Sequence, residues 1–215
     1  FAIKYQEQRI VLSNLINSES KILYDRNPRD RIAKVAPWLT IDGDPYPAVV
    51  DGKILWILDG YTTSNGYPNS RKINLADTAD ALTSRANAVA SLQDKSVNYI
   101  RNSVKATVDA YDGTITLYQW DEKDPVLATW SKAFPGTVKA KSEISKELLS
   151  HIRYPEDMFR VQRDILSAYH VTSADAFYGG QDFWRVPRDP STFGANAGNQ
   201  PPVYLTMQIP GQSKP

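Results

Sequence analysis

Four aspartates close together in the chain are the residues best suited to chemistry: Asp42, Asp44, Asp51 and Asp59. Carboxylates on either side of a groove can serve as the acid and base of a glycoside hydrolase, and carboxylate oxygens can bind calcium. Their spacing matches no calcium-binding loop, and both Asp51-Gly52 and Asp42-Gly43-Asp44-Pro45 are typical turn sequences. Turn formation is therefore the simpler interpretation. A catalytic or binding role for Asp42, Asp44 and Asp59 is the alternative.

The chain offers little else for catalysis. Its two histidines, His151 and His170, each fall near the end of a predicted helix, where the helix dipole favours an imidazolium. The sequence has no Gly-x-Ser-x-Gly elbow, no His-Glu-x-x-His zinc motif, no phosphate loop and no Gly-x-Gly-x-x-Gly fingerprint. We therefore expect no catalytic residue of these classes, no metal and no cofactor, and an enzyme is the less favoured interpretation.

Aromatic residues supply a second candidate site. The chain contains five tryptophans and twelve tyrosines, side chains that can stack on sugars or form protein interfaces. Trp56 and Trp130 fall on apolar stripes and are expected in the core. Tyr118 and Trp120 project from the polar face of a predicted hairpin, so they form the candidate binding patch, with partial burial under a helix as the alternative.

Composition excludes several classes of function. The formal charge is +1, from 25 Lys and Arg against 24 Asp and Glu, which argues against nucleic-acid binding. Because the chain has no cysteine, disulfides, thiolate metal sites and a cysteine nucleophile are excluded. Its apolar runs are far shorter than the ~20 residues of a membrane-spanning helix. Since it starts at Phe1 without a signal region, we interpret it as an excerpt from a longer protein.

Two Asp-Gly steps predict the β-structure that positions these residues. In the first, Tyr46 to Val50 pairs with Lys53 to Leu58 around a two-residue type I′ turn at Asp51-Gly52. This register places Val49 opposite Ile54. Both faces of the hairpin are apolar, so we expect it to be covered on both sides, as a buried centre or an interface.

The second hairpin turns at Asp112-Gly113, which places Ala110 opposite Ile115. Apolar and polar residues alternate along both of its strands. One face is therefore expected to be buried and the other, which carries Lys105 and Thr107, to be exposed.

Helices and loops complete the predicted architecture, an α+β domain over residues 1–215 with helices packed on an antiparallel sheet built on the two Asp-Gly hairpins. A helix begins at Asn27-Pro28 and ends before Pro37, and the strongest helix begins with Pro155 at its first position. The remaining predicted segments are helices over 6–16, 76–92, 124–134 and 145–152, strands over 181–186 and 203–209, a mobile excursion over 60–96 and a loop over 187–202.

Several segments resemble those of one known family. They are Asn17 to Arg26, Val35 to Thr40, Asp42 to Val49, Asp59 to Ser64, Asn98 to Lys105, Val108 to Gly113, His151 to Asp157 and Gln181 to Trp184. In this order they are similar to the uncharacterised protein family numbered 0182, large envelope proteins found chiefly in actinobacteria. The similarity covers most of residues 17–186 and weakens over 71–95 and beyond Pro190.

The resemblance implies a location more than an activity. Family members combine several predicted transmembrane helices with a long extracytoplasmic region, so this chain would lie outside the cell membrane, tethered through its parent protein. No catalytic residues follow from the resemblance. We expect a non-enzymatic domain for assembly or for binding an envelope lipid, glycan or protein. The alternatives are an envelope enzyme that uses its carboxylates on glycan or lipid, and a solute-binding domain of a transport-related membrane protein.

Overall fold

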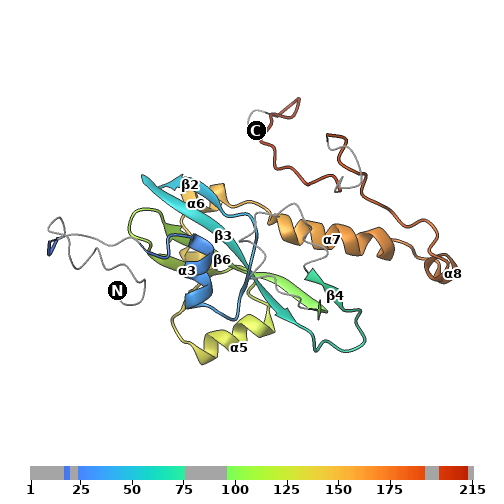
Figure 1. Cartoon of the computed structure of the whole chain (residues 1–215), viewed down its shortest axis with the longest axis horizontal. Coiled ribbons are helices and arrows are strands. Elements are labelled where there is room, and N and C mark those ends of the chain that lie inside the picture. Colours follow the sequence, from blue (N-terminus) through green and yellow to red (C-terminus); the bar gives the residue numbers. More distant parts are fainter. Residues whose placement is uncertain (1–16, 20–23, 76–95, 192–198, 213–215) are drawn as a thin grey trace.

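The computed structural model describes residues 17–19, 24–75, 96–191 and 199–212. These residues form an α+β fold, as the sequence predicts (Figure 1). The main sheet has the strand order β1-β3-β6-β7-β8, with β2 also paired to β3, while β4 and β5 form a separate small sheet. The strands are β1 Thr40–Ile41, β2 Tyr46–Val50, β3 Lys53–Ser64, β4 Ile73–Asn74, β5 Ser96–Val97, β6 Tyr99–Asp109, β7 Ile115–Gln119 and β8 Val138–Lys139.

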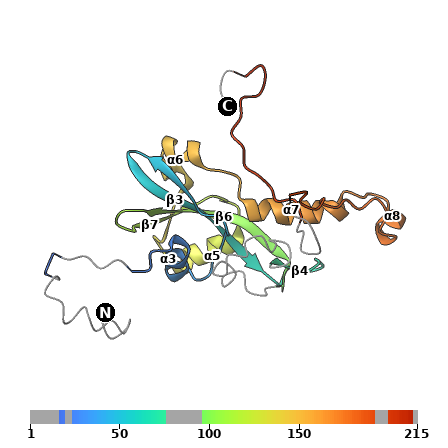
Figure 2. The ribbon, with the colours of Figure 1, turned by 45° about the horizontal axis from the view of Figure 1, so that its top comes forward.

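Helices cover both faces of the main sheet. They are α3 Pro28–Val35, α5 Pro125–Ala133, the 3-10 turn η2 Lys141–Glu143, α6 Lys146–His151, α7 Glu156–Tyr169 and α8 Ala174–Tyr178. Figure 2 shows α3 and α5 below the sheet and α6 above it. Pairing within the main sheet is antiparallel except between β7 and β8, which run parallel.

Local sequence signals explain where the helices begin. The Asn27 side chain accepts a hydrogen bond from the Arg29 amide, and the Asp124 side chain accepts from two amides of α5. Both α3 and α5 have proline at the first helical position, where its missing N–H leaves no hydrogen bond unmade. Ser145 caps α6 in the same way. The predicted starts of these helices are confirmed.

The larger core lies between the sheet and the helices α3 and α5. Its buried members are Ile32, Ala36, Leu39, Ile41, Leu58, Val104, Ala106, Val108, Leu117 and Leu127. Trp56 packs against this core, and Trp38 stacks on Trp130 with 5.5 Å between ring centroids. The layer is close-packed at Gly60, where a Cβ atom would lie 3.1 Å from the Leu39 side chain.

The first hairpin turns at Asp51 and Gly52, which both have positive φ, 50° and 76°. Val49 lies opposite Ile54, in the expected register. The expectation that both faces are covered is wrong at the tip, where Val49 and Ile54 are 59% and 56% exposed. On the other face, Ile57 is buried in a cluster with Leu148 of α6. On the face that carries Val49 and Ile54 the core reaches only as far as Trp56, so this face of the tip stays open.

The second hairpin has a longer loop than predicted. Val108, rather than Ala110, lies opposite Ile115. The Asp109 carboxylate accepts hydrogen bonds from two loop amides at 2.8 and 3.2 Å, which ends the strand early. Ala110 donates its N–H to Ile54 of β3 instead. Because the pairing shifts by two residues, each side chain keeps its predicted face.

The polar face of this hairpin is covered along β6, against the prediction. β6 is a central strand between β3 and β7, and both Lys105 and Thr107 are buried. Alternation in the sequence shows that the two faces differ in polarity, but it does not show whether the polar face meets water or other polar groups. Here it meets polar groups, as described below.

Two predicted strands are not strands. Residues 181–186 and 203–209 lie in no strand of the described chain. The first segment is held by Trp184. Its backbone amide donates a hydrogen bond to the Ser167 carbonyl at 2.9 Å, and its ring stacks on that of His170 with 3.8 Å between centroids. The second is exposed at its large apolar side chains, Val203, Tyr204, Leu205, Met207 and Ile209. β-propensity favours an extended backbone, but a strand also needs a neighbouring edge.

The boundaries of the excursion also differ from the prediction. β3 continues to Ser64, so residues 60–64 belong to the sheet. The helices predicted over 6–16 and 76–92 lie outside the described residues. Among the described helices, none has the length and apolar character needed to cross a membrane.

Candidate functional site

Charged side chains are buried between the sheet and the start of α7. Asp59 on β3 lies directly opposite Lys105 on β6, and the two form an ion pair although their side chains are only 4% and 2% exposed. Asn102 donates a hydrogen bond to Asp59 at 2.7 Å, and the Lys105 ammonium donates to the Arg153 carbonyl at 3.0 Å. Both buried charges therefore have the partners that burial requires.

Asp42 connects the loop after β1 to α7. Its carboxylate accepts hydrogen bonds from the buried Tyr61 hydroxyl, from the Asp44 amide at 2.8 Å and from the Asp157 amide at 3.2 Å. Asp157 lies in the first turn of α7, where amides lack a partner inside the helix and the dipole favours negative charge. Asp42 therefore satisfies the start of a helix that lies 115 residues away in sequence.

Asp157 makes the reverse contact. Its carboxylate accepts a hydrogen bond from the Gly43 amide at 2.8 Å and lies 3.4 Å from the Arg160 guanidinium. The same guanidinium pairs with Glu156 one turn earlier, at the i, i+4 spacing that brings side chains together on a helix. Asp42 and Asp157 thus each bind the backbone of the other's segment, and we call this pair the carboxylate clamp.

Burial changes how tightly these groups hold protons. Desolvation, reinforced by the charge of Asp42, raises the pKa of Asp157 to about 7. Desolvation also raises the pKa of Asp59, with Lys105 opposing the shift. The pKa of the Tyr61 hydroxyl lies well above its usual value because of its burial and the neighbouring carboxylates. A carboxylic acid that keeps its proton near neutral pH is one result of this crowding.

Three of the four predicted aspartates line one cavity. It has a volume of about 230 Å³, and Asp42, Asp44 and Asp59 all contribute to its wall. Asp51 lies apart at the tip of the first hairpin, where it accepts a hydrogen bond from the Ser145 hydroxyl at 3.4 Å. The structure therefore brings Asp42, Asp44 and Asp59 together and leaves Asp51 to its turn.

Another wall of this cavity comes from the end of the chain. Pro202, Val203 and Tyr204 line it. The Arg153 guanidinium lies 4.5 Å from the Tyr46 ring centroid and 4.7 Å from that of Tyr204. These cation–π contacts join the extended segment to the sheet.

Most of the carboxylates are committed to structural contacts. Asp42 and Asp59 are buried, and each accepts hydrogen bonds from its neighbours. Asp44 is exposed and Glu156 half-buried, and desolvation raises the pKa of Glu156, with Asp44 adding to the shift and Arg160 opposing it. Asp44 and Glu156 are therefore the groups able to exchange a proton with a molecule in the cavity. In the described ranges, no three His, Asp or Glu side chains are placed to hold a metal.

Tyr118 and Trp120, the predicted aromatic patch, are both half-buried. Tyr118 packs against the cluster that contains Leu148 of α6. The Trp120 ring lies 4.2 Å from the Lys141 ammonium and 5.2 Å from that of Lys105, and it lines a cavity of about 550 Å³. Partial burial, the alternative given by the sequence, describes both rings. Ligand binding by them stays a prediction.

The two histidines occupy helix ends. His170 is the C-cap of α7, with Nδ1 2.8 Å from the Leu166 carbonyl. His151 is the last residue of α6 and is exposed. Both positions agree with the helix-end interpretation, and neither residue lines the carboxylate cavity.

Sequence reasoning did not identify Lys105 or Asp157 as members of this site. The apolar run before Asp59 is a signal, because a charge at the end of such a run predicts a buried partner of opposite sign. It does not identify Lys105 as that partner, since the alternation of Val104, Lys105 and Ala106 is equally typical of a strand with one exposed face. Asp157 gives no such signal, since acidic residues are common in the first turn of helices.

Comparison with known proteins gives one family. The family model described as Uncharacterised protein family (UPF0182) matches residues 1–215. A UPF0182 protein of Thermobifida fusca (strain YX) is 61% identical over 218 residues, covering 100% of this chain and 21% of the relative. Similar proteins of Kineococcus radiotolerans and Frankia alni are each 57% identical and are covered over 22% and 21% of their length. The chain thus spans about a fifth of these relatives. No solved structure matches it.

Proposed function

Since the chain belongs to the uncharacterised protein family UPF0182 and spans about a fifth of its relatives, we propose that it is a non-enzymatic module of a longer cell-envelope protein. Its role is to dock onto another part of that protein or onto a protein partner. The module lies on the extracytoplasmic side of the membrane. This location rests on the resemblance of its segments to envelope proteins.

The observation that carries the docking role is the exposed apolar segment over residues 203–209. Five of its seven side chains are large, apolar and exposed, and Leu205 reaches 71%. Contiguous apolar exposure of this kind usually marks an interaction surface. In the described chain, the one backbone hydrogen bond recorded for this segment is from the Gln212 amide to the Ile209 carbonyl.

An extended backbone whose other amides and carbonyls make no backbone hydrogen bond within the described chain fits one mode of recognition, addition as a strand to the edge of another sheet. In such a strand Leu205, Met207 and Ile209 point to one side, and Thr206 and Gln208 point to the other. The segment would then bury its apolar side against the partner and pair its backbone with the partner's edge strand.

The state of the carboxylates supports a non-enzymatic role. Asp42 and Asp157 bind backbone amides across two segments, and Asp59 neutralises Lys105. Each of these contacts is explained by the need to pair buried polar groups. The aspartates at the cavity therefore hold the fold together and require no substrate to account for them.

Photo-crosslinking in cells tests the docking role. A photoreactive phenylalanine at position 205 of the parent protein should give a crosslinked product, because the proposal buries Leu205 against a partner surface. The same residue at position 111 is the matched control, since Tyr111 is 87% exposed at the far tip of the second hairpin. Equal crosslinking at both positions, or none at 205, contradicts docking through this segment.

The location has its own test, because the chain contains no cysteine. A Tyr111→Cys variant of the parent protein should react in intact cells with a maleimide that cannot cross the membrane, and the unmodified protein provides the background. Reaction only after the cells are lysed would place this region on the cytoplasmic side and contradict the proposed location.

A second candidate function, an envelope enzyme, is favoured by the cavity that Asp44 and Glu156 line. In this case Glu156 would hold a proton for the reaction and Asp44 would act as the base. The test is release of reducing ends from purified envelope glycan. Loss of that release in both Asp44→Asn and Glu156→Gln, with unfolding unchanged, would support the enzyme, and absence of any release from the wild-type protein would rule this hydrolysis out.

A further inference from the structure

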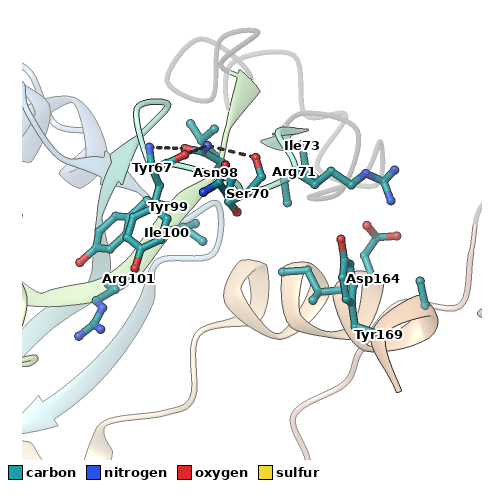
Figure 3. Close-up of a pocket in the computed structure, with 14 residues that line it drawn as sticks. Tyr67, Ser70, Arg71, Ile73, Asn98, Tyr99, Ile100, Arg101, Asp164 and Tyr169 are labelled. Atoms are coloured by element: carbon teal, nitrogen blue, oxygen red, sulfur yellow. Dashed lines mark hydrogen bonds between the residues drawn. The ribbon is translucent and has the colours of Figure 1, made fainter. Parts of the chain in front are cut away.

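A larger cavity lies between the C-terminal half of α7 and the strands β4, β5 and β6. Its volume is about 580 Å³, within the range of small-molecule sites, and none of its lining residues lines the carboxylate cavity. Figure 3 shows the strand residues on one side and Asp164 and Tyr169 of α7 on the other. No sequence motif marks this cavity, because its walls come from three segments that lie far apart in the chain.

One wall is fixed by Asn98. Its side-chain amide donates hydrogen bonds to the carbonyls of Tyr67 and Ser70 at 2.7 and 3.3 Å, and its oxygen accepts one from the Tyr67 amide at 3.0 Å (Figure 3). A single side chain thereby holds the turn over 67–70 against the start of β6. A wall that is already in place lowers the entropy cost of binding a ligand.

Tyrosine rings lie on both sides of the cavity. Tyr67 stacks on Tyr99 with 6.0 Å between centroids, and the Tyr99 hydroxyl donates to Asp124 at 2.6 Å. On the helix side, the Tyr169 ring packs 5.4 Å from that of Phe177. Although each ring is held by a neighbour, Tyr67 is 57% and Tyr169 54% exposed. The cavity therefore offers rigid aromatic surface to a ligand.

Two opposite charges at the cavity have no partner among the described residues. Arg71 and Asp164 both line it, and Figure 3 shows the Asp164 carboxylate directed toward Arg71. Across the residues that the structure describes, neither side chain has a recorded hydrogen bond or ion pair. Arg101, in contrast, is bound to Asp121 at 2.8 Å. The Arg71 guanidinium and the Asp164 carboxylate thus have no net charge together. The guanidinium offers several N–H donors to a ligand, and the carboxylate is a strong acceptor.

We propose that this cavity binds a short neutral carbohydrate. The tyrosine rings suit the C–H faces of a pyranose, while the carboxylate and the guanidinium suit its hydroxyl groups. The Asp164 carboxylate would repel an anionic head group, and the Arg71 guanidinium would repel a cationic ligand. A polyhydroxylated neutral ligand satisfies both charges. This inference is independent of docking through residues 203–209.

The test is saturation-transfer NMR of the full chain with maltose, cellobiose and lactose at millimolar concentration, and in parallel sedimentation with phosphatidylglycerol vesicles. We expect saturation transfer to at least one sugar and no vesicle binding. Absence of transfer to all three sugars overturns the proposal, and so does binding to vesicles alone.

Substitutions of residues that line the cavity test whether the sugar binds there. Tyr169→Ala should weaken the affinity for the sugar roughly fivefold, and Asp164→Ala roughly tenfold. Tyr169→Phe keeps the ring and should retain most of the affinity. The matched control is Tyr178→Ala, a ring 89% exposed on α8 and outside the cavity. Should Tyr169→Ala fail to fold, Tyr67→Ala in the exposed turn replaces it. Unchanged affinity in the ring and Asp164 variants overturns the assignment.

Discussion

Replacing Asp157 with asparagine should change how the stability of the protein depends on pH. Asp157 is buried in the carboxylate clamp beside Asp42, Glu156 and Arg160, and its pKa is raised from the usual 3.8 to about 7. Between these two values the folded protein keeps a proton that the unfolded chain releases. The stability that depends on this proton is therefore complete below pH 3.8 and is lost as the pH rises through 7.

The two pKa values set the size of the effect. Ionisation of Asp157 favours the unfolded chain by about 1.5 kcal/mol at pH 5 and by roughly 4 kcal/mol at pH 8. Asparagine does not ionise, and its side-chain oxygen can still accept the hydrogen bond from the Gly43 amide. Relative to the wild type, the Asp157→Asn variant should thus gain about 2.5 kcal/mol of stability between pH 5 and pH 8.

Urea unfolding followed by tryptophan fluorescence measures this difference. Both proteins are unfolded at several pH values from 5 to 8, and the wild-type free energy of unfolding is subtracted from that of the variant. The subtraction removes the titration of groups common to both proteins, such as Asp59. Gln162→Asn, on the exposed side of the same helix, is the matched control, because it changes a side chain of α7 without removing an ionisable group.

Parallel curves for the wild type and Asp157→Asn would refute the reasoning. That result would mean that Asp157 stays ionised in the folded protein because the Gly43 amide and Arg160 outweigh its burial. Carbon-13 NMR of the Asp157 carboxyl gives an independent reading, and a pKa near 4 is incompatible with the proposed balance.

Three further substitutions probe the polar contacts and the core through the free energy of unfolding in urea. Lys105→Met should cost about 3–5 kcal/mol, because it leaves Asp59 buried without its partner, whereas Lys53→Met, at an exposed ion pair, should cost less than about 1 kcal/mol. Leu127→Ala should cost about 2–5 kcal/mol, since the side chain is fully buried and leaves a cavity. Asp124→Ala should cost at least about 2 kcal/mol, because it removes the cap of α5 and leaves three hydroxyl groups without their acceptor.

Elements with local signals could be predicted from the sequence. Asn27 and Asp124 cap helices whose first residue is proline, and both signals lie within a few residues of the structure that they determine. The turn at Asp51-Gly52 is equally local, because both residues adopt positive φ.

Features that depend on distant contacts could not be predicted. The register of the second hairpin depends in part on Ala110, whose N–H donates to the carbonyl of Ile54 on β3 rather than to β7. The burial of Lys105 follows from the strand order, because β6 lies between β3 and β7 and is therefore a central strand. Residues 203–209 have the composition of a strand, but no strand of the described chain pairs with them.

The candidate site shows the same division. The sequence places Asp42 and Asp44 in a turn, and the structure agrees that backbone amides bind Asp42. That Asp42 also meets the first turn of α7 depends on where the tertiary fold places the start of this helix. No spacing rule connects residues 115 positions apart.

The long ladder between β3 and β6 ends at the pair formed by Ser64 and Tyr99, which separates the main sheet from the segments between these two strands. The described residues 65–75 and 96–98, which we call the detour, leave the sheet after Ser64 and return to it at Tyr99. The detour supplies the turn over 67–70 together with β4 and β5, and so a large part of the proposed carbohydrate cavity. Replacing it with a short turn would cost little chain entropy and would leave the main core in place. What the protein recognises could therefore be exchanged between relatives, or redesigned, without altering how it folds.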